Sequence, residues 1–325
     1  MNCYNCGKPI TDLNRTEEHV INNSLGGHLT SDDILCDGCN NFFGHSLDKE
    51  IDGQIGMFAD LLGAKRHREN KYRRIRIKMI SDKGEIKIVG RKIRPLHELL
   101  LDTGKKTIKL FETEEKYEAL KSEKKKELSR NSKVEDNEYI RPTDKTKWHV
   151  KNIKSDAQGN IAFGGYDYFR GLARICLNFY LSKGHNLKYA EKVLAFVQGK
   201  IKFNDLMYYY FPVNYQIHEL KKDEVLHIIH VDGDPVKKLL YAYLELFNFQ
   251  NVLLIFDNNY QGPEIRDTYV YDLVNGAEIE KQITLRVLRH HVEIMHLIEP
   301  SFDREHLARY NRFQQIIERN QLIGD

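Results

Sequence analysis

Two pairs of closely spaced cysteines near the start of the chain constrain its fold more than any other feature. Cys3 and Cys6 form one C-x-x-C pair, and Cys36 and Cys39 form a second. Two residues between thiols let both sulfurs bind one ion at about 2.3 Å, and two such pairs complete a tetrahedral site. Four thiolates leave no open coordination position, so the spacing predicts a structural zinc ion that contributes to folding.

The segment between the two pairs is longer than in a simple zinc ribbon and contains groups suited to hydrolysis. Glu18 and His19 lie in this segment, and Asn40 follows the second pair directly. Carboxylate and amide oxygens suit a hard divalent cation such as Mg²⁺ or Mn²⁺. An imidazole titrates near neutral pH and can take a proton from water. These residues fit the needs of a metal site for hydrolysis, such as that of a phosphodiester bond, supported by the cysteine framework.

The order of these motifs resembles the HNH endonuclease family in its zinc-stapled ββα-metal form, in the subgroup with Asn in place of the last His. The matching elements are Glu18-His19, Gly26-Gly27, Cys36-x-x-Cys39-Asn40, Phe43-Gly44 and Asp48. The resemblance covers roughly residues 1–55 and implies a nuclease domain that acts on DNA. It implies that His19 is the general base and that Glu18 and Asn40 hold the catalytic cation.

Some assignments inside the motif stay open. Strict strand alternation would place Glu17 on the face of His19, whereas the family pattern favours Glu18 as the ligand; a local bulge would reconcile the two. The family often has an Asn at the position of Ser31, and Asp32 is an alternative for its role in orienting the histidine.

Two further residues lie outside this core of the motif. Asp48 follows Asn40 by two helical turns on nearly the same face, so it is either a further ligand of the catalytic metal, an outer-shell group or a helix charge. Cys176 lies in an apolar helical segment and is expected to be a buried core residue.

A basic segment follows the cysteine-rich region. Basic and apolar residues alternate from Arg74 to Lys78, which predicts a strand, and the turn at 82–84 predicts a hairpin with 85–89. Its charge density favours contacts with the phosphates of a nucleic acid. The residues expected to make these contacts are Arg73, Arg74, Arg76 and Lys78.

The remaining pattern predicts an α+β protein. We expect a nuclease domain at 1–60, a basic hairpin and helical connector at 61–145, and an α+β accessory domain for specificity or regulation at 146–325. Helices are expected at 112–130, within 168–196 with a break near Gly184, and at 235–247. Strands are expected at 225–231, 252–256, 269–273 and 282–287. A polar boundary is expected at 131–147 and a hairpin around 156–160.

Composition sets limits on location and partners. The net charge of +3 among 325 residues gives no general indication of nucleic-acid binding, so any such site must be local. The sequence lacks a run of about 18 apolar residues for a membrane span and begins without a secretory pattern. We therefore expect a cytoplasmic protein with reduced cysteines and no membrane partner.

The sequence thus predicts a DNA endonuclease with structural Zn²⁺ and catalytic Mg²⁺ or Mn²⁺, and the resemblance suggests a bacterial or phage defence effector. The rival interpretation is a non-catalytic zinc module that binds nucleic acid or protein. Such a module needs the cysteines but has no need for Glu18, His19 and Asn40 together. RNA as the substrate, a homodimer, and a regulatory ligand or protein partner for the C-terminal part remain open.

Overall fold

The computed structural model describes residues 1–67, 164–201, 206–210, 212 and 215–287, five strands between residues 74 and 110, and residues 315–316. The chain divides into two compact units, one made of Met1–Lys71 with Ile161–Asp325 and the other of Tyr72–Asn160. Both helices and sheets are present, which confirms the α+β class. The helix expected at 112–130, the boundary at 131–147 and the hairpin around 156–160 lie outside the described residues. Within the described ranges, no helix has the length and apolar character needed to cross a membrane.

The N-terminal segment forms a short antiparallel hairpin followed by two helices. Strand β1 (Glu18–His19) pairs with β2 (Thr30–Ser31), and a 3-10 turn, η1 (Asn23–Leu25), lies between them. The two glycines after η1 make the turn tight. A Cβ on Gly27 would lie 1.8 Å from the Ile21 carbonyl oxygen, so any side chain there would collide with backbone. The Gly-Gly pair is therefore required by the geometry of the hairpin.

The two helices after the hairpin are separate elements. Helix α1 (Asp37–His45) ends just before Ser46, and α2 (Leu47–Leu62) begins just after it. Ser46 closes α1, because its N–H donates to the Phe43 carbonyl at 3.1 Å and its hydroxyl donates to the Phe42 carbonyl at 2.8 Å. The expectation that Asp48 lies on one continuous helix with Asn40 is therefore wrong, since Asp48 lies in the first turn of α2.

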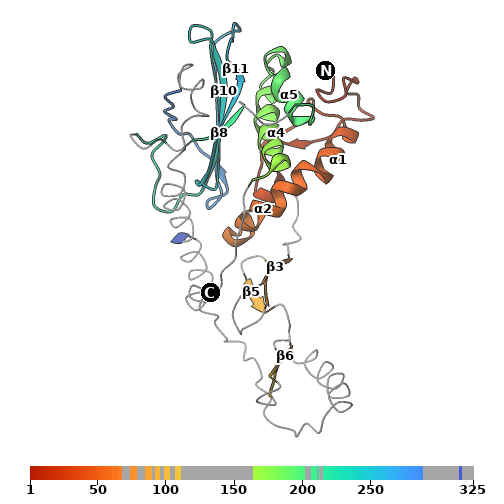
Figure 1. The fold of residues 1–325 in the computed structure, drawn as a ribbon, viewed down its shortest axis with the longest axis vertical. Helices are drawn as coiled ribbons and strands as arrows, with labels where there is room; N and C mark the ends of the chain where they lie inside the picture. The colour runs from red at the N-terminus through yellow and green to blue at the C-terminus, as the bar shows by residue number, and fades with distance from the viewer. Residues whose placement is uncertain are drawn as a thin grey trace. The chain divides into compact units, whose positions relative to one another are not determined.

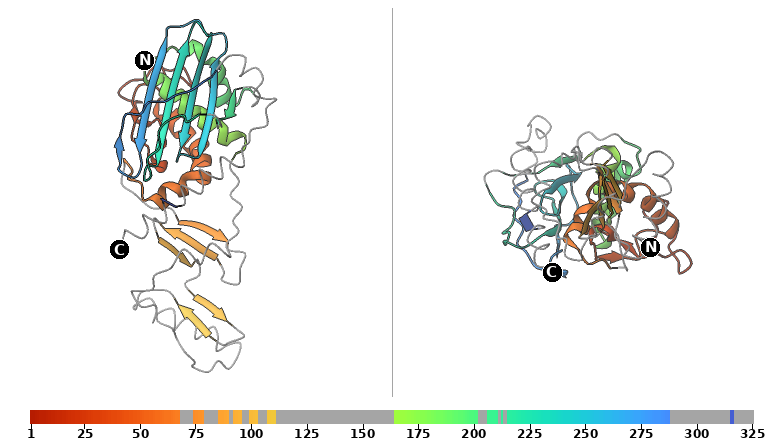
Figure 2. Two further views of the ribbon diagram at one scale, coloured as in Figure 1. Left: turned by 90° about the vertical axis from the view of Figure 1, so that its left-hand side faces the viewer. Right: turned by 90° about the horizontal axis from the view of Figure 1, so that it is seen from below.

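The C-terminal part of the same unit contains a six-stranded antiparallel sheet in the order β13-β12-β9-β10-β11-β8 (Figure 2). The predicted strands at 225–231, 252–256 and 269–273 are confirmed. The expected strand at 282–287 is wrong: this segment runs beside residue Ile217, to which Thr284 donates one backbone hydrogen bond of 2.7 Å, but it joins no ladder. The strands are β8 (Met207–Tyr209), β9 (Leu226–Asp234), β10 (Leu239–Leu246), β11 (Gln250–Asp257), β12 (Ile265–Asp272) and β13 (Ala277–Glu278).

The helix expected at 235–247 is also wrong, because this segment is a turn followed by the central strand β10. Asp234 makes the turn by accepting hydrogen bonds from the N–H groups of Val236 and Lys237 at 2.8 and 3.0 Å. Every residue of β10 is buried, so the strand reads as a continuous apolar run without alternation. A run of this kind cannot be distinguished from a buried helix by periodicity alone.

Two helices pack on one face of the sheet, the face on which the N-terminal segment also lies (Figure 1). They are α4 (Tyr166–Ser182) and α5 (Glu191–Val197), joined through η3 (Leu187–Tyr189), and the predicted break near Gly184 is confirmed. Helices α2 and α4 pack closely, because a Cβ on Gly171 would lie only 2.6 Å from Ile51 Cδ1. One apolar cluster contains Phe43 of α1, Leu172 of α4 and Leu244 of β10. The N-terminal segment and the sheet therefore share a hydrophobic core.

The second unit contains two small antiparallel sheets. Strands β3 (Arg74–Lys78), β4 (Glu85–Val89) and β5 (Lys92–Pro95) form one sheet, and β6 (Leu99–Asp102) pairs with β7 (Thr107–Leu110) in the other. The register pairs Arg74 with Val89 and Lys78 with Glu85, which confirms the predicted hairpin. Arg73 lies just outside the described residues.

Candidate active site and zinc site

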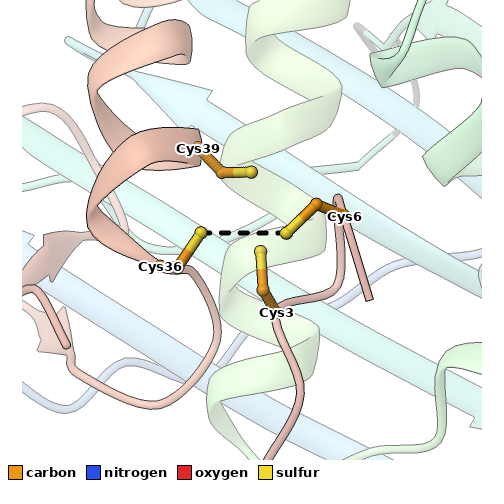
Figure 3. A group of neighbouring side chains, drawn as sticks. All are labelled: Cys3, Cys6, Cys36 and Cys39. Carbon is orange, nitrogen blue, oxygen red and sulfur yellow. Dashed lines mark hydrogen bonds between the residues drawn. The ribbon is translucent and has the colours of Figure 1, made fainter. Parts of the chain in front are cut away.

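The four cysteines of the two pairs lie together (Figure 3). Their Sγ atoms are all within 4.8 Å of one another, and the Sγ atoms of Cys6 and Cys36 are 3.8 Å apart. A tetrahedron with metal–sulfur bonds of about 2.3 Å has edges of about 3.8 Å, so this donor set fits a zinc ion. Cys36 occupies the position just before α1, and Cys39 lies in the first turn of that helix. Gly7, with a φ of 72°, closes the turn that carries the first cysteine pair.

The C-terminal part of the chain supports the cysteine cluster. The Asn5 side chain donates to Cys39 Sγ at 3.3 Å, and Gln198 at the end of α5 donates to the Asn5 carbonyl at 3.0 Å. Burial raises the pKa of Cys39 to about 12, whereas the Lys8 backbone N–H lowers the pKa of Cys6 to about 7. A bound Zn²⁺ would hold all four sulfurs as thiolates.

The cysteine framework positions Asn40 beside the segment that precedes β1. It follows Cys39 in α1, and its Nδ2 donates to Thr16 Oγ1 at 3.2 Å. The start of α1 is fixed to the same stretch by the Arg15–Cys36 bridge and by a 2.9 Å bond from the Asp37 N–H to the Asn14 carbonyl. Because its amide nitrogen is engaged, Asn40 can offer its carbonyl oxygen to a hard cation.

His19 lies half-buried on β1, beside two other imidazoles. The rings of His19 and His67 meet edge to face with centroids 5.3 Å apart, and those of His67 and His28 are 5.9 Å apart. His28 also stacks on Tyr271 of β12 at 4.6 Å and donates to the Lys65 carbonyl at 3.0 Å. Neither His28 nor His67 was identified from the sequence, because His28 follows the glycine pair without a motif and His67 lies beyond α2.

Glu18 lies on the other side of β1 and faces α4. Its side chain is 3% exposed, and its Oε1 accepts hydrogen bonds from Arg174 Nη2 and, at 2.8 Å, from Asn178 Nδ2. The Nη1 of Arg174 donates to Asp48 Oδ1, so one guanidinium bridges two carboxylates. Neither Arg174 nor Asn178 was identified from the sequence, since each occupies an ordinary position in an amphipathic helix.

The charge of this cluster is only partly balanced. Burial raises the pKa of Glu18 to about 7, although the neighbouring Arg174 opposes this shift, and burial also raises the pKa of Asp48. With both carboxylates ionised, the cluster has one more negative charge than positive. The raised pKa values mean that either a proton or a bound cation can offset the second negative charge of this cluster.

The register of the hairpin bears on the choice between Glu17 and Glu18. Glu18 pairs with Ser31 and His19 pairs with Thr30, one to one, so these two pairs contain no bulge. Glu17 is exposed and accepts a 3.4 Å hydrogen bond from the Thr30 hydroxyl. Alternation therefore places Glu17 on the His19 side of the strand and Glu18 on the α4 side, so the hairpin leaves both carboxylates as candidate ligands.

The two side chains expected to orient His19 have other partners. The Ser31 hydroxyl donates to Asp33 Oδ1 at 2.8 Å, and Asp32 accepts from Arg15 at 3.2 Å in an exposed ion pair. A role for Ser31 or Asp32 in orienting the histidine stays a prediction. Cys176 is buried in α4, as expected for a core residue.

Residues 3–55 match the model of a protein family described as HNH endonuclease. With the four-cysteine cluster, this match confirms the resemblance inferred from the motifs: the N-terminal segment is an HNH endonuclease domain of the zinc-binding kind. Neither the curated proteins nor the solved structures contain a match to the chain. A nuclease-type function and a nucleic-acid substrate follow from this domain.

Proposed function

We propose that the protein is an endonuclease that hydrolyses phosphodiester bonds of DNA with one divalent cation, Mg²⁺ or Mn²⁺. His19 is the general base, and Glu18 and Asn40 hold the cation, with Glu17 as the alternative carboxylate. The observation that carries the proposal is the contact between Asn40 and Thr16, because it ties the residue after the zinc knuckle to the segment just before β1, the strand that bears His19.

Each residue has a defined task in this reaction. His19 takes a proton from the attacking water, and its half-buried position on a paired strand restricts its motion. The amide nitrogen of Asn40 is held by Thr16, which leaves its carbonyl oxygen for the cation. One carboxylate oxygen of Glu18 is held by Arg174, which leaves the other oxygen for the cation. When bound, the cation would neutralise charge on the phosphate and on the leaving oxygen. Asp48 reaches the site through Arg174 and is an outer-shell group in this proposal.

The remaining parts of the chain are proposed to supply binding and control. The basic strand β3 offers Arg74, Arg76 and Lys78, with Arg73 before it, for contacts with phosphates. The division at 1–60, 61–145 and 146–325 stays a prediction, as do the cytoplasmic location and the defence role. Because the nuclease domain and the C-terminal sheet share one hydrophobic core, we infer that they act as one structural unit.

Cleavage of supercoiled plasmid by the full-length protein tests the proposal. We expect nicked and linear products with Mg²⁺ or Mn²⁺ and none with EDTA, and RNA tested in parallel decides between the two nucleic acids. Zinc content and circular dichroism must first show that the protein is loaded and folded. DNA binding without cleavage under any of these metals would overturn the proposal and favour the non-catalytic zinc module.

A further inference from the structure

Helix α4 supplies part of the nuclease site from outside the HNH domain. Arg174 and Asn178 lie one helical turn apart on α4, and both donate to Glu18, which is more than 150 residues earlier in the chain. The family match ends at residue 55, so neither residue belongs to the matched segment. We propose that Arg174 and Asn178 are positioning residues that orient the Glu18 carboxylate for the catalytic cation. This inference rests on the proposed function.

The orientation of the Asn178 amide is fixed by a third residue. The Tyr4 hydroxyl donates to Asn178 Oδ1 at 2.8 Å, so the opposite end of the amide, Nδ2, must point to Glu18. Tyr4 lies between the first two zinc ligands. The zinc knuckle therefore sets the direction of the hydrogen bond that Glu18 receives.

The pattern of donors selects one oxygen of the carboxylate. Both hydrogen bonds end on Oε1 of Glu18, which commits that oxygen to α4 and makes Oε2 the atom that a cation would take. Outer partners of this kind fix the direction of a ligand and commonly change metal affinity or activity by about 10–100-fold when removed. The carboxylate is thus held in one orientation before any cation binds.

Arg174 is itself held rigidly. Its side chain is 1% exposed, its guanidinium lies 4.9 Å from the centre of the Phe43 ring of α1, and its second nitrogen engages Asp48 of α2. Because Asp48 and Glu18 share the two ends of one planar guanidinium, Arg174 cannot turn away from Glu18 without losing Asp48.

Direct binding of Mn²⁺ by the full-length, zinc-loaded protein tests the inference. Free Mn²⁺ is measured by electron paramagnetic resonance for the parent, Asn178→Ala and Arg174→Lys, and plasmid cleavage is measured across a Mn²⁺ titration. Lysine keeps the charge but cannot bridge two carboxylates as a planar fork does. We expect about 10-fold weaker Mn²⁺ binding in each variant, and cleavage that returns to within about twofold of the parent at saturating Mn²⁺.

Arg170→Lys is the matched control on the same helix. Arg170 bonds to Asp167 and to the carbonyls of Phe196 and Val197, away from Glu18, so this variant should change thermal stability without changing Mn²⁺ binding. Parent-like Mn²⁺ binding and metal dependence in both α4 variants would overturn the inference and leave the proposed function intact. Tighter binding or faster cleavage would also overturn it, because α4 would then block the site. A folded parent that neither binds Mn²⁺ nor cleaves would overturn both.

Discussion

Arg174 of α4 donates to the carboxylate of Glu18, the residue that precedes the proposed general base. This buried ion pair joins the first strand of the HNH domain to a helix that also packs against the C-terminal sheet. The sheet approaches the same domain again at the Gly-Gly turn, where His227 of β9 donates to the Leu25 carbonyl at 3.0 Å. The HNH domain is therefore supported by the C-terminal part of the chain at its strand, its turn and its zinc knuckle.

The zinc site predicts about one zinc ion per chain, measurable by inductively coupled plasma mass spectrometry. Replacing Cys39 by Ser removes a ligand next to Asn40, so the variant should lose zinc and unfold at a lower temperature. Cys176→Ser is the control, since this buried thiol in α4 should leave zinc content unchanged. Well-folded parent protein without zinc would contradict the assignment.

The Gly-Gly turn predicts a large effect of a single methyl group. Gly27→Ala places Cβ 1.8 Å from the Ile21 carbonyl oxygen, so the hairpin must distort, and we expect a loss of about 3 kcal/mol or more in the free energy of unfolding. The control is Gly53→Ala, in the exposed face of α2 with no atom near its Cβ. That variant should be stabilised by up to about 1 kcal/mol in urea denaturation. Equal stability of the two variants would count against the turn geometry.

His227 makes stability depend on pH. The imidazole is fully buried, donating from Nε2 to Leu25 and accepting at Nδ1 from the Phe247 N–H at 3.4 Å, so only the neutral ring satisfies both bonds. Burial lowers its pKa from 6.5 to about 4. The unfolded chain then binds the proton more readily than the folded one, so stability is complete above pH 6.5 and declines as the pH falls toward 4.

The size of this effect follows from the shift. The pKa of His227 is 6.5 in the unfolded chain and about 4 in the folded protein. This shift corresponds to a contribution on the order of 3 kcal/mol to the free energy of unfolding, which is lost as the pH falls through that interval. Urea denaturation of the parent and of His227→Gln at pH 7 and pH 4.5 measures it. The glutamine variant cannot titrate, so its stability should fall less with acid than that of the parent. The same pH dependence in both proteins would exclude His227 as the source.

The basic strand predicts a salt-dependent contribution to DNA binding. If Arg74, Arg76 and Lys78 contact phosphates, replacing all three by Gln should weaken binding uniformly across sequences. The slope of log affinity against log salt should shrink by about 0.9 for each lost contact with duplex DNA. Glu85→Gln on the paired strand β4, where no phosphate contact is proposed, serves as the control. An unchanged slope would assign β3 a structural role.

Local patterns account for what the sequence predicts correctly. The cysteine pairs, the glycine turn and the residues around His19 lie within about 40 positions and carry motif spacing, so the zinc framework and the HNH domain are readable directly. The alternating strand β3 is also visible, because its period is local. These signals do not depend on knowing the rest of the fold.

The errors have a different physical origin. Strand β10 is buried on both faces, so its apolar run carries no alternation and resembles a helix. The partners of Glu18 are separated from it by more than 150 residues, and an arginine in an amphipathic helix gives no sign that it will be buried against two carboxylates. Only the packing of α4 against both β1 and α2 brings these charges together.

The activity of His19→Ala is the most direct test of the proposed mechanism. The full-length variant should keep its zinc, its fold and its DNA affinity, but cleave plasmid about 10²–10⁴-fold more slowly, because a general base acts only in the transition state. Raising Mg²⁺ or Mn²⁺ should not restore it, whereas Asn40→Ala and Glu18→Ala should recover in part. If Glu17→Ala loses cleavage and Glu18→Ala keeps it, the metal ligand is Glu17 and not Glu18. If His19→Ala cleaves plasmid as fast as the parent across the metal titration, the assignment of His19 as general base is wrong.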